Sequence, residues 1–281
     1  MEIHDALQWG MGELCSLDQP RLEAEVLLCH VLGAERIFLK THPEKKISWW
    51  SFLLYKKCVQ KRKKGIPVAY IVGYKDWGGM RVSVNKHVLI PRDETEILCE
   101  HIMAEKRESA PRHILDMGTG SGCIALSLVR AFPTAEIIAL DNSSKALRVA
   151  RKNFSSSTLI GDAYMRPLQQ IRFMQSDLLE KIPTHSAFDL IVANLPYVPE
   201  TLAVSPEVRK EPHQAIFSGS DGLDLIRKFS QQLKEKQIIF SELWLEFLPF
   251  QQKEIKKIFS GYQIKFFTDC GGTVFFARIL N

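Results

Sequence analysis

The sequence predicts an α/β fold, in which a doubly wound, largely parallel sheet with a C-terminal antiparallel hairpin follows a small helical domain. Three observations predict this arrangement. From His113 onward, apolar strand patterns alternate with helical patterns, which is typical of a parallel sheet covered by helices. Residues 1–74 show helical periodicity. Two final strand patterns, 263–268 and 274–279, are joined by Cys270-Gly271-Gly272 without a helix, which indicates a hairpin.

Length and composition agree with a protein that buries a sizeable core. The chain has 281 residues, 46% of them hydrophobic, which corresponds to one large domain or two smaller ones. Its formal net charge of +5 fits an acidic partner or nucleic acid, but it also fits many ordinary proteins. The N-terminus lacks a signal-peptide pattern, and no apolar run approaches the roughly 20 residues that span a bilayer. We therefore expect a soluble, cytoplasmic protein with no membrane partner.

The cysteines predict no metal site. None of the six belongs to a Cys-x-x-Cys pair or lies at zinc-binding spacing from a histidine. We interpret them as buried thiols in a reducing compartment.

The predicted helical domain covers residues 1–74. Apolar residues recur at helical spacing between Leu22 and Val31, and Gly33 is a suitable stop. A second helix is expected over 48–64, and the segment Lys56–Lys64 is rich in lysine and arginine. This basic run either docks on an acidic surface of a partner or is a solvated helix face, and the pattern leaves both open.

Residues 75–90 are predicted to form a β-hairpin connector. Met80, Val82 and Val84 alternate with polar residues, as in a half-buried strand, and Gly78-Gly79 before them favours a turn. The remaining region, 91–281, begins with a helix expected over 94–106 and continues as the α/β sheet. Its further helices are expected at 123–131, 144–153 and 223–233, and its parallel strands at 114–115, 136–140, 171–174, 190–193 and 237–240.

A glycine-rich loop after the first of these strands predicts a cofactor site. Asp116-Met117 leads into Gly118-Thr119-Gly120-Ser121-Gly122, and a helix follows. Glycines let the backbone turn sharply and touch a ligand, while a helix N-terminus favours a carboxylate or phosphate. A dinucleotide site of the form Gly-x-Gly-x-x-Gly fails, because Cys123 stands where the third glycine belongs.

The observed spacing, with an acidic residue two positions before the first glycine, resembles the S-adenosylmethionine loop of Rossmann-like methyltransferases. In that interpretation Asp116 organises the loop or meets the methionine amino group. The alternative is an ordinary glycine-rich turn.

Acidic residues end the next two strands. Asp141 lies about 20 residues after the glycine loop, where a carboxylate can bind ribose hydroxyls, although an Asp at a strand end can also cap a helix. Asp177 and Leu178 follow the third strand and are placed to meet the adenine. A solvated Asp177 is the alternative.

The buried strand 188–193 ends in Asn194-Leu195-Pro196-Tyr197, which predicts the catalytic and substrate-binding segment. In an open α/β sheet, ligands bind beyond the carboxyl ends of the strands, so this segment faces the same crevice as the glycine loop. Asn194 Oδ1 and the Leu195 carbonyl can accept the two N–H bonds of a planar nitrogen, and Tyr197 can pack against it. Asn194 also borders the cofactor. Alternatively, these residues form an ordinary turn.

Taken together, the motifs resemble the release factor glutamine methyltransferase family, the PrmC/HemK group. The resemblance covers nearly the whole length, and the helical domain and the Ile-Pro-Arg segment are its narrowest features. The motifs are Pro67 to Ile71 with Gly73, Ile90-Pro91-Arg92-Asp93-Glu94-Thr95-Glu96, Leu115 to Gly122, Asp141, Ser176-Asp177, Asn194 to Tyr197, and Glu211-Pro212 before Gly222-Leu223.

This resemblance implies a Rossmann-like class I methyltransferase sheet and S-adenosyl-L-methionine as the cofactor. It implies methyl transfer to the side-chain amide N5 of the glutamine in the Gly-Gly-Gln motif of class I peptide-chain release factors, which supports translation termination. Asn194 would hold that amide, Tyr197 would pack on it, and residues 1–74 would recognise the substrate. No direct nucleic-acid partner is expected.

The chain also departs from the family pattern. Leu195 replaces a usual proline, which keeps the carbonyl acceptor but relaxes the fixed φ, so we expect activity with a less rigid loop. Asp93 stands where proline is frequent, and Leu178 where an aromatic residue is frequent. Leu243-Trp244-Leu245 replaces a glycine-containing stretch that is expected after the fifth strand.

Two other functions remain open on the sequence. A nucleic-acid N-methyltransferase would use the same Asn-x-Pro-Tyr chemistry, but it should carry a stronger basic surface or a recognition domain. The other function is that of a cofactor-binding module without catalytic activity, in which the replacement of proline by Leu195 has abolished catalysis.

Overall fold

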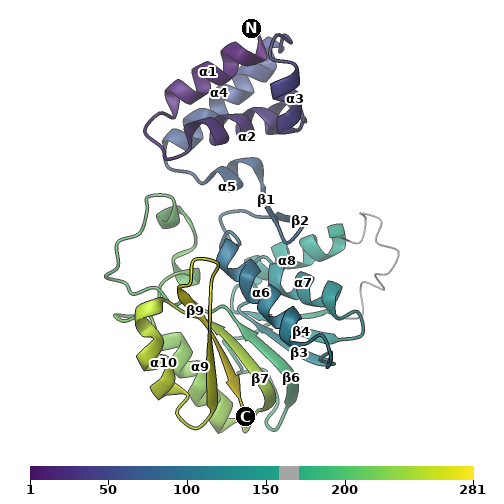
Figure 1. The fold of residues 1–281 in the computed structure, drawn as a ribbon, viewed down its shortest axis with the longest axis vertical. Coiled ribbons are helices and arrows are strands. Elements are labelled where there is room, and N and C mark those ends of the chain that lie inside the picture. The colour runs from purple at the N-terminus through teal and green to yellow at the C-terminus, as the bar shows by residue number, and fades with distance from the viewer. Residues whose placement is uncertain (158–170) are drawn as a thin grey trace. The chain divides into compact units, whose positions relative to one another are not determined.

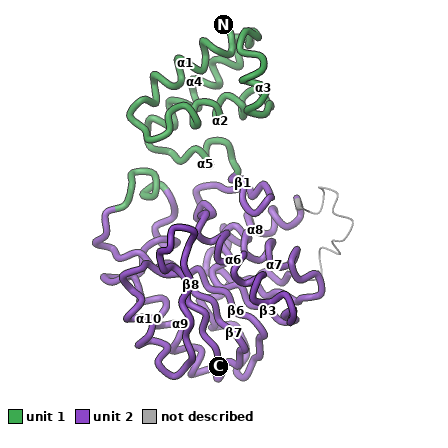
Figure 2. The backbone as a smooth tube through the Cα atoms, viewed as in Figure 1, with its two compact units in different colours: residues 1–74, 204–210 green, residues 75–203, 211–281 purple. Residues whose placement is uncertain are grey.

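The chain divides into two units in the computed structural model, which describes residues 1–157 and 171–281. One unit comprises residues 1–74 together with 204–210, and the other comprises residues 75–203 and 211–281 (Figure 2). The short segment 204–210 therefore belongs to the first unit, although it lies between elements of the second in sequence.

The first unit is helical. Its core is formed by apolar side chains that repeat at helical spacing, among them Leu27 and Leu28, and by the buried ring of Tyr55. Tyr55 also donates a hydrogen bond of 3.2 Å to the Ala24 carbonyl. The helices are α1 (Ile3–Glu13), α2 (Pro20–Leu32), α3 (Arg36–Thr41), α4 (Trp49–Lys63) and α5 (Val68–Val72).

Part of the basic run in α4 is internal to this unit. The Arg62 side chain is only 2% exposed and forms ion pairs with Glu23 of α2 and with Glu207 of the segment 204–210. Lys63 pairs with Glu13 at 2.6 Å. A buried guanidinium needs such partners, because an unpaired charge is costly to bury. The run is therefore not simply a solvated helix face, since Arg62 joins α4 to α2 and to the segment 204–210.

The second unit contains a short hairpin and a seven-stranded sheet with the strand order β5-β4-β3-β6-β7-β9-β8 (Figure 1). The strands β3 to β7 are parallel, and the last two are antiparallel. Its strands are β1 (Tyr74–Trp77), β2 (Met80–Ser83), β3 (His113–Met117), β4 (Glu136–Asp141), β5 (Ile171–Gln175), β6 (Ala187–Ala193), β7 (Ile239–Glu246), β8 (Gln263–Thr268) and β9 (Val274–Leu280). The fold class predicted from the sequence is confirmed.

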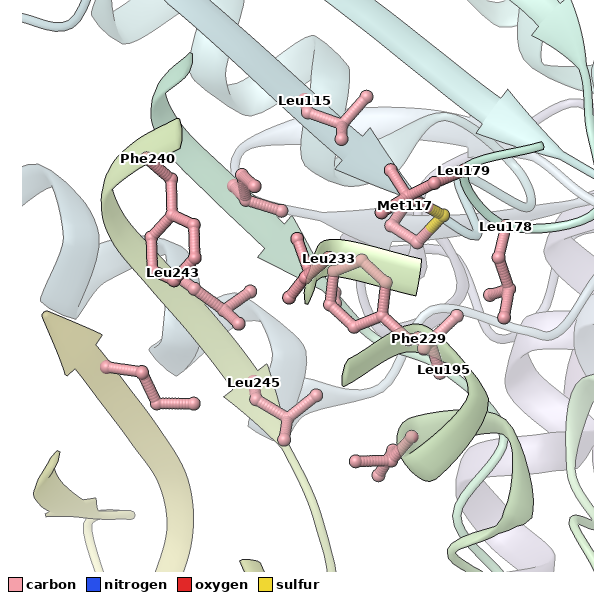
Figure 3. Close-up of a cluster of buried hydrophobic side chains, with 14 of the residues drawn as sticks. Leu115, Met117, Leu178, Leu179, Leu195, Phe229, Leu233, Phe240, Leu243 and Leu245 are labelled. Carbon is pink, nitrogen blue, oxygen red and sulfur yellow. The ribbon is translucent and has the colours of Figure 1, made fainter. Parts of the chain in front are cut away.

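Helices cover both faces of this sheet. The helices α6 (Asp93–Glu105), α7 (Cys123–Ala131) and α8 (Ser144–Ser157) lie on one face, and α9 (Asp224–Glu235) and α10 (Gln252–Ile258) lie on the other (Figure 1). Short 3-10 turns occur at Val208–Lys210, His213–Ala215 and Pro249–Gln251. The core beneath α9 contains Phe229 and Leu233 packed with Phe240, Leu243 and Leu245 of β7 (Figure 3).

Strand register brings the predicted motifs together. Met117 pairs with Ala193, so the glycine loop and Asn194 leave neighbouring parallel strands at the same level. The chain order reverses between these two strands, because β4 lies beyond β3 on one side and β7 beyond β6 on the other. Such a switch point is where open α/β sheets bind ligands.

The fifth parallel strand is longer than the sequence pattern suggested. The apolar pattern predicted an end at Phe240, but β7 continues to Glu246, so Leu243-Trp244-Leu245 lies within the strand rather than after it. These three side chains are buried on both faces of the sheet, where no alternation marks a strand. The extension matters because it carries Glu246 to the carboxyl end of the sheet.

The six cysteines differ in their exposure. Cys15 and Cys270 are exposed, contrary to the expectation of buried thiols, because they lie in turns. The other cysteines are buried or half-buried, and all six are free.

In the described part of the chain, no helix is both long and apolar enough to cross a membrane.

Candidate functional site

The glycine loop is held tightly against the neighbouring strands. The Thr119 amide donates to the Leu140 carbonyl of β4 at 2.8 Å. Gly118 has a φ of +74°, and a Cβ placed there would lie 3.3 Å from the Asn194 carbonyl oxygen. Glycine is required at this position for its backbone conformation and for the close approach of the loop to Asn194.

Asp116 lies beneath the loop and organises it. Its carboxylate is fully buried, and Oδ2 accepts a hydrogen bond of 2.6 Å from the Thr119 hydroxyl. Burial raises the pKa of Asp116 to about 7. Within the described residues, Oδ1 is the one buried side-chain oxygen or nitrogen atom without a partner. Of the two roles predicted for Asp116, this geometry favours the organising one.

A cavity of about 960 Å³, counting the part open to solvent, lies at the carboxyl ends of β3 to β6. Most of the predicted site residues line it, whereas Asp116, Gly122 and Tyr197 do not. Gly122 instead packs against α8, because a Cβ there would lie 3.1 Å from the Ala150 Cβ. The predicted residues that line the cavity are Gly118, Thr119, Gly120, Ser121, Asp141, Asp177, Leu178, Asn194, Leu195 and Pro196.

Asp141 joins the glycine loop to the following helix. Its carboxylate accepts hydrogen bonds from the Gly120 amide at 2.9 Å and from the Ser143 amide at 2.8 Å. Burial raises its pKa, against the lowering effect of these two bonds. The hydroxyl of Ser143 accepts from the Ala146 amide at 3.2 Å and so caps α8. Asp141 thus fixes the loop while it lines the cavity.

The residues after β5 are placed differently from one another. Asp177 pairs with Lys228 of α9 at 2.6 Å, with both side chains about half exposed. Leu178 is buried and adopts a left-handed backbone with a φ of +50°. Leu178 therefore presents an apolar wall to the cavity, and Asp177 is ion-paired rather than only solvated.

The Asn194-Leu195-Pro196-Tyr197 segment is held by side chains from three other elements. Asn194 Nδ2 donates to the Thr95 hydroxyl of α6 at 2.9 Å, and the Tyr197 hydroxyl donates to Glu246 Oε1 at 2.6 Å. Gln251 Nε2 donates to the Tyr197 carbonyl at 2.8 Å. These contacts restrain the segment at both ends.

Leu195 is buried in the same hydrophobic core cluster as Phe229 and Leu178 (Figure 3). Its side chain is only 3% exposed. Burial of a leucine side chain stabilises its position by about 2 kcal/mol. Packing at Leu195 therefore supplies the restraint that a proline would give through its fixed φ.

Glu246 is the charged residue at the centre of these contacts. It is fully buried, and Oε2 accepts a hydrogen bond of 2.9 Å from the Thr95 hydroxyl. Burial raises the pKa of Glu246 to about 7, and its two hydrogen bonds oppose that shift. Burial and the neighbouring Glu246 carboxylate also raise the pKa of Tyr197 well above its usual range. A pKa near neutrality is typical of residues at functional sites.

Sequence reasoning missed several residues that shape this cavity. His87 lies in a turn and lines the cavity with Val88 and Leu89. Arg92 lines the cavity and pairs with the buried Glu211 at 2.5 Å. Both residues lie in segments that resemble the family's motifs, which is the sequence feature that could have identified them. Their contact was not predictable, because the two residues are 119 positions apart. No cluster of His, Cys, Asp or Glu that could hold a metal ion occurs in residues 1–157 and 171–281.

Two family models match the chain. Residues 5–73 match the PrmC N-terminal domain, and residues 93–214 match the methyltransferase small domain. The first covers helices of the first unit, and the second covers the segment from the start of α6 through the glycine loop and Asn194 to Tyr197. The chain therefore carries a methyltransferase domain.

Two solved structures agree with this fold. The catalytic domain of hMettl16 in complex with MAT2A 3'UTR hairpin 1 has a TM-score of 0.52 and 15% identity, covering 86% of this chain and 84% of that one. A methyltransferase from Pyrococcus furiosus has a TM-score of 0.50 and 16% identity, covering 72% of this chain and 89% of that one. At these identities the likeness shows the class I methyltransferase fold alone.

Curated relatives are much more similar in sequence. The release factor glutamine methyltransferase of Koribacter versatilis (strain Ellin345) is 38% identical over 244 residues, which cover 84% of this chain and 82% of that protein. The release factor glutamine methyltransferase of Buchnera aphidicola subsp. Schizaphis graminum is 34% identical over 279 residues, covering 97% of this chain and 96% of that protein. This chain belongs to the release factor glutamine methyltransferase family.

Proposed function

We propose that this enzyme transfers a methyl group from S-adenosyl-L-methionine to the side-chain amide N5 of the glutamine in the Gly-Gly-Gln motif of class I peptide-chain release factors. One observation carries the proposal. Asn194 directly follows β6, whose last residue, Ala193, pairs with Met117 of β3, and it lines the same cavity as the glycine loop. Its side-chain amide is held by a hydrogen bond to Thr95. Family membership supports the choice of substrate.

The residues around the cavity fit S-adenosyl-L-methionine. The loop Gly118–Ser121 offers backbone amides at a helix N-terminus, which suit the methionine carboxylate. Asp141 offers carboxylate oxygens that suit ribose hydroxyls, and Leu178 offers an apolar wall that suits the adenine. Bound there, the cofactor supplies an electrophilic methyl group on a sulfonium.

The residues of the Asn194–Tyr197 segment would orient the acceptor. The side-chain oxygen of Asn194 and the carbonyl of Leu195 accept the two N–H bonds of the glutamine amide, which sets its weakly nucleophilic nitrogen in line with the methyl group. Tyr197 packs on the planar amide. No strong base is required, because the methylated nitrogen becomes acidic and releases its proton. Positioning of this kind can supply roughly 7–11 kcal/mol in favourable cases.

The helical unit would recognise the release factor. Residues 1–74 act in this proposal as a substrate-recognition domain, residues 75–90 as a hairpin connector, and residues 91–281 as the catalytic domain. The match of residues 5–73 to the PrmC N-terminal domain supports this division of labour. Because the partner is a protein of the translation apparatus, we expect the enzyme to act in the cytoplasm without a nucleic-acid partner.

Mass-spectrometric mapping tests the proposal. The protein is incubated with a purified class I release factor and isotopically labelled cofactor, and the methylated residue is located by peptide fragmentation. The expected product carries one methyl group on the Gly-Gly-Gln glutamine. Label on a different residue, or label only in added nucleic acid, would refute the proposed substrate.

A further inference from the structure

We propose that Thr95 and Glu246 are positioning residues that set which end of the Asn194 amide faces the substrate. This inference deepens the proposed function and rests on it. Neither residue was assigned a role by the sequence motifs, and both are almost fully buried, at 2% and 0% exposure. They form a chain of hydrogen bonds from Glu246 through Thr95 to Asn194.

The direction of each hydrogen bond follows from the chemistry of the groups. An ionised carboxylate has only acceptor atoms, so the Thr95 hydroxyl must donate its single proton to Glu246 Oε2, at 2.9 Å. The Thr95 oxygen is then left as an acceptor toward Asn194, also at 2.9 Å. Only the amide nitrogen of Asn194 can donate to it.

This polarity decides what Asn194 presents to the cavity. Its Nδ2 is bound to Thr95, so Oδ1, on the other side of the planar amide, is the end left to receive an N–H bond from a substrate. A flipped amide would present a donor to a donor and would repel the glutamine nitrogen. The Glu246–Thr95 pair therefore removes the wrong orientation before the substrate binds, which lowers the entropic cost of reaching the reactive geometry.

Glu246 reaches the other end of the segment as well. Its second oxygen, Oε1, accepts from the Tyr197 hydroxyl at 2.6 Å. One carboxylate thus orients both polar side chains of the Asn194–Tyr197 segment. The strand register explains how: Ala193 pairs with Leu245, so the next residue on each strand, Asn194 and Glu246, emerges at the same edge of the sheet.

The main test compares two substitutions of Thr95. Thr95→Val keeps the shape but removes the hydroxyl, and we expect turnover on the release factor to fall about 100-fold, the cost typical of a small misplacement of reacting groups. Thr95→Ser keeps the hydroxyl, so its turnover should remain close to that of the wild type. Cofactor affinity, measured by calorimetry, should change little in either variant.

A control separates positioning from stability. Ser230→Ala removes another buried hydroxyl, which donates to the Ile258 carbonyl at 3.3 Å, and Ser230 does not line the cavity. This control should lower the melting temperature without the fall in turnover. Thr95→Val with wild-type turnover, or Thr95→Ser as impaired as Thr95→Val, would overturn the proposal.

A second readout requires no turnover. The side-chain amide protons of Asn194 are assigned by NMR in the wild type and both variants. The hydrogen-bonded proton of Nδ2 should shift in Thr95→Val and remain near its wild-type position in Thr95→Ser, and an unchanged spectrum in Thr95→Val would contradict the proposal. If the wild type methylates a different nitrogen, the proposed substrate is wrong, while the same series on that acceptor still tests the positioning role.

Discussion

At the scale of single residues, the proposed chemistry depends on one amide. Asn194 is fixed at its nitrogen end by Thr95 and borders the cavity that the glycine loop forms. We expect Asn194→Ala to lower turnover by about 100-fold or more, because a misplaced acceptor loses the in-line geometry. Cofactor affinity should change much less. Steady-state kinetics combined with calorimetric cofactor binding measures both, and equal losses in the two would contradict a positioning role.

We expect the carboxyl of Glu246 to make activity depend on pH. The groups that act on it are Tyr197 and Thr95, which hydrogen-bond it, and Glu94 and Arg92, whose charges raise and lower its pKa respectively. With a pKa of about 7, Glu246 is protonated below neutrality and can then donate to Thr95, which reverses the polarity of the chain of bonds. Turnover of the wild type should therefore rise as the pH passes through about 7, and Glu246→Gln should flatten this rise. A profile identical in both proteins would refute the link.

The same pKa has a consequence for stability. The folded-state pKa of Glu246 lies above its ordinary value of 4.5, so the native protein binds more protons than the unfolded chain between these values. Stability from this group is therefore greatest at low pH and falls as the pH rises from 4.5 through 7. Relative to Glu246→Gln, the wild type should lose free energy of unfolding across that window, as measured by denaturant titration. Asp116 also titrates near 7, but it is present in both proteins.

At the scale of elements, the loop after β6 is restrained although it lacks the family's first proline. Leu195 is anchored in the core, and Gln251 binds the carbonyls of both Tyr197 and Asp221 at 2.8 Å. Gly222 lies against this contact. The departure from the family's proline predicted a less rigid loop. The structure shows packing and side-chain hydrogen bonds at this loop, which would oppose that effect.

Gly222 is the position where this restraint is easiest to break. It has a φ of +83°, and a Cβ there would lie 2.1 Å from the Tyr197 carbonyl oxygen. Gly222→Ala should cost at least about 1–2 kcal/mol from the left-handed backbone and should displace the Asn194–Tyr197 segment. We expect a lower melting temperature together with a strong loss of turnover. Gly261→Ala is the control, because a Cβ there meets nothing within 4 Å. A similar loss of turnover in that variant would contradict a specific role of Gly222 in placing the Asn194–Tyr197 segment.

At the scale of the whole molecule, two units share the work in the proposed function. Within the residues the structure describes, the cavity is lined entirely by the second unit. The first unit carries large exposed side chains at the start of α4, with Trp49 65% and Trp50 71% exposed. Exposed tryptophans are frequent in protein interfaces. The substrate-recognition role of this unit thus has a surface on which it can be tested.

The double variant Trp49→Ala, Trp50→Ala should raise KM for a full-length release factor while turnover on a short Gly-Gly-Gln peptide remains unchanged. The reason is that, in the proposed function, the peptide would engage only the cavity, whereas the intact factor would also engage the helical unit. Steady-state kinetics with both substrates makes the comparison. Ile239→Ala, an exposed apolar position of the second unit, should alter neither value. An unchanged KM for the intact factor in the tryptophan variant would show that this surface takes no part in substrate recognition.

The alternation of helices and strands from α6 to β7, the glycine loop and the Asn194–Tyr197 segment were predictable from the sequence, whereas α10 and the shorter helices of the first unit were not. Periodicity, glycine spacing and turn chemistry act over a few residues, so they are readable without a fold. The parallel sheet then required those segments to meet at one edge. The candidate site residues Gly118, Asp141 and Asn194, which line the cavity, were predicted in this way.

Only the tertiary structure revealed what holds the site in place. Thr95 contacts residues 99 and 151 positions away, and Gln251 contacts the Tyr197 carbonyl 54 positions away. Glu246 was missed because β7 is buried on both faces, which hides its length from any alternating pattern. The sequence alone therefore predicted which groups carry the proposed chemistry. Burial and strand register decided which side chains contact those groups, because long-range contacts leave no local periodicity to read.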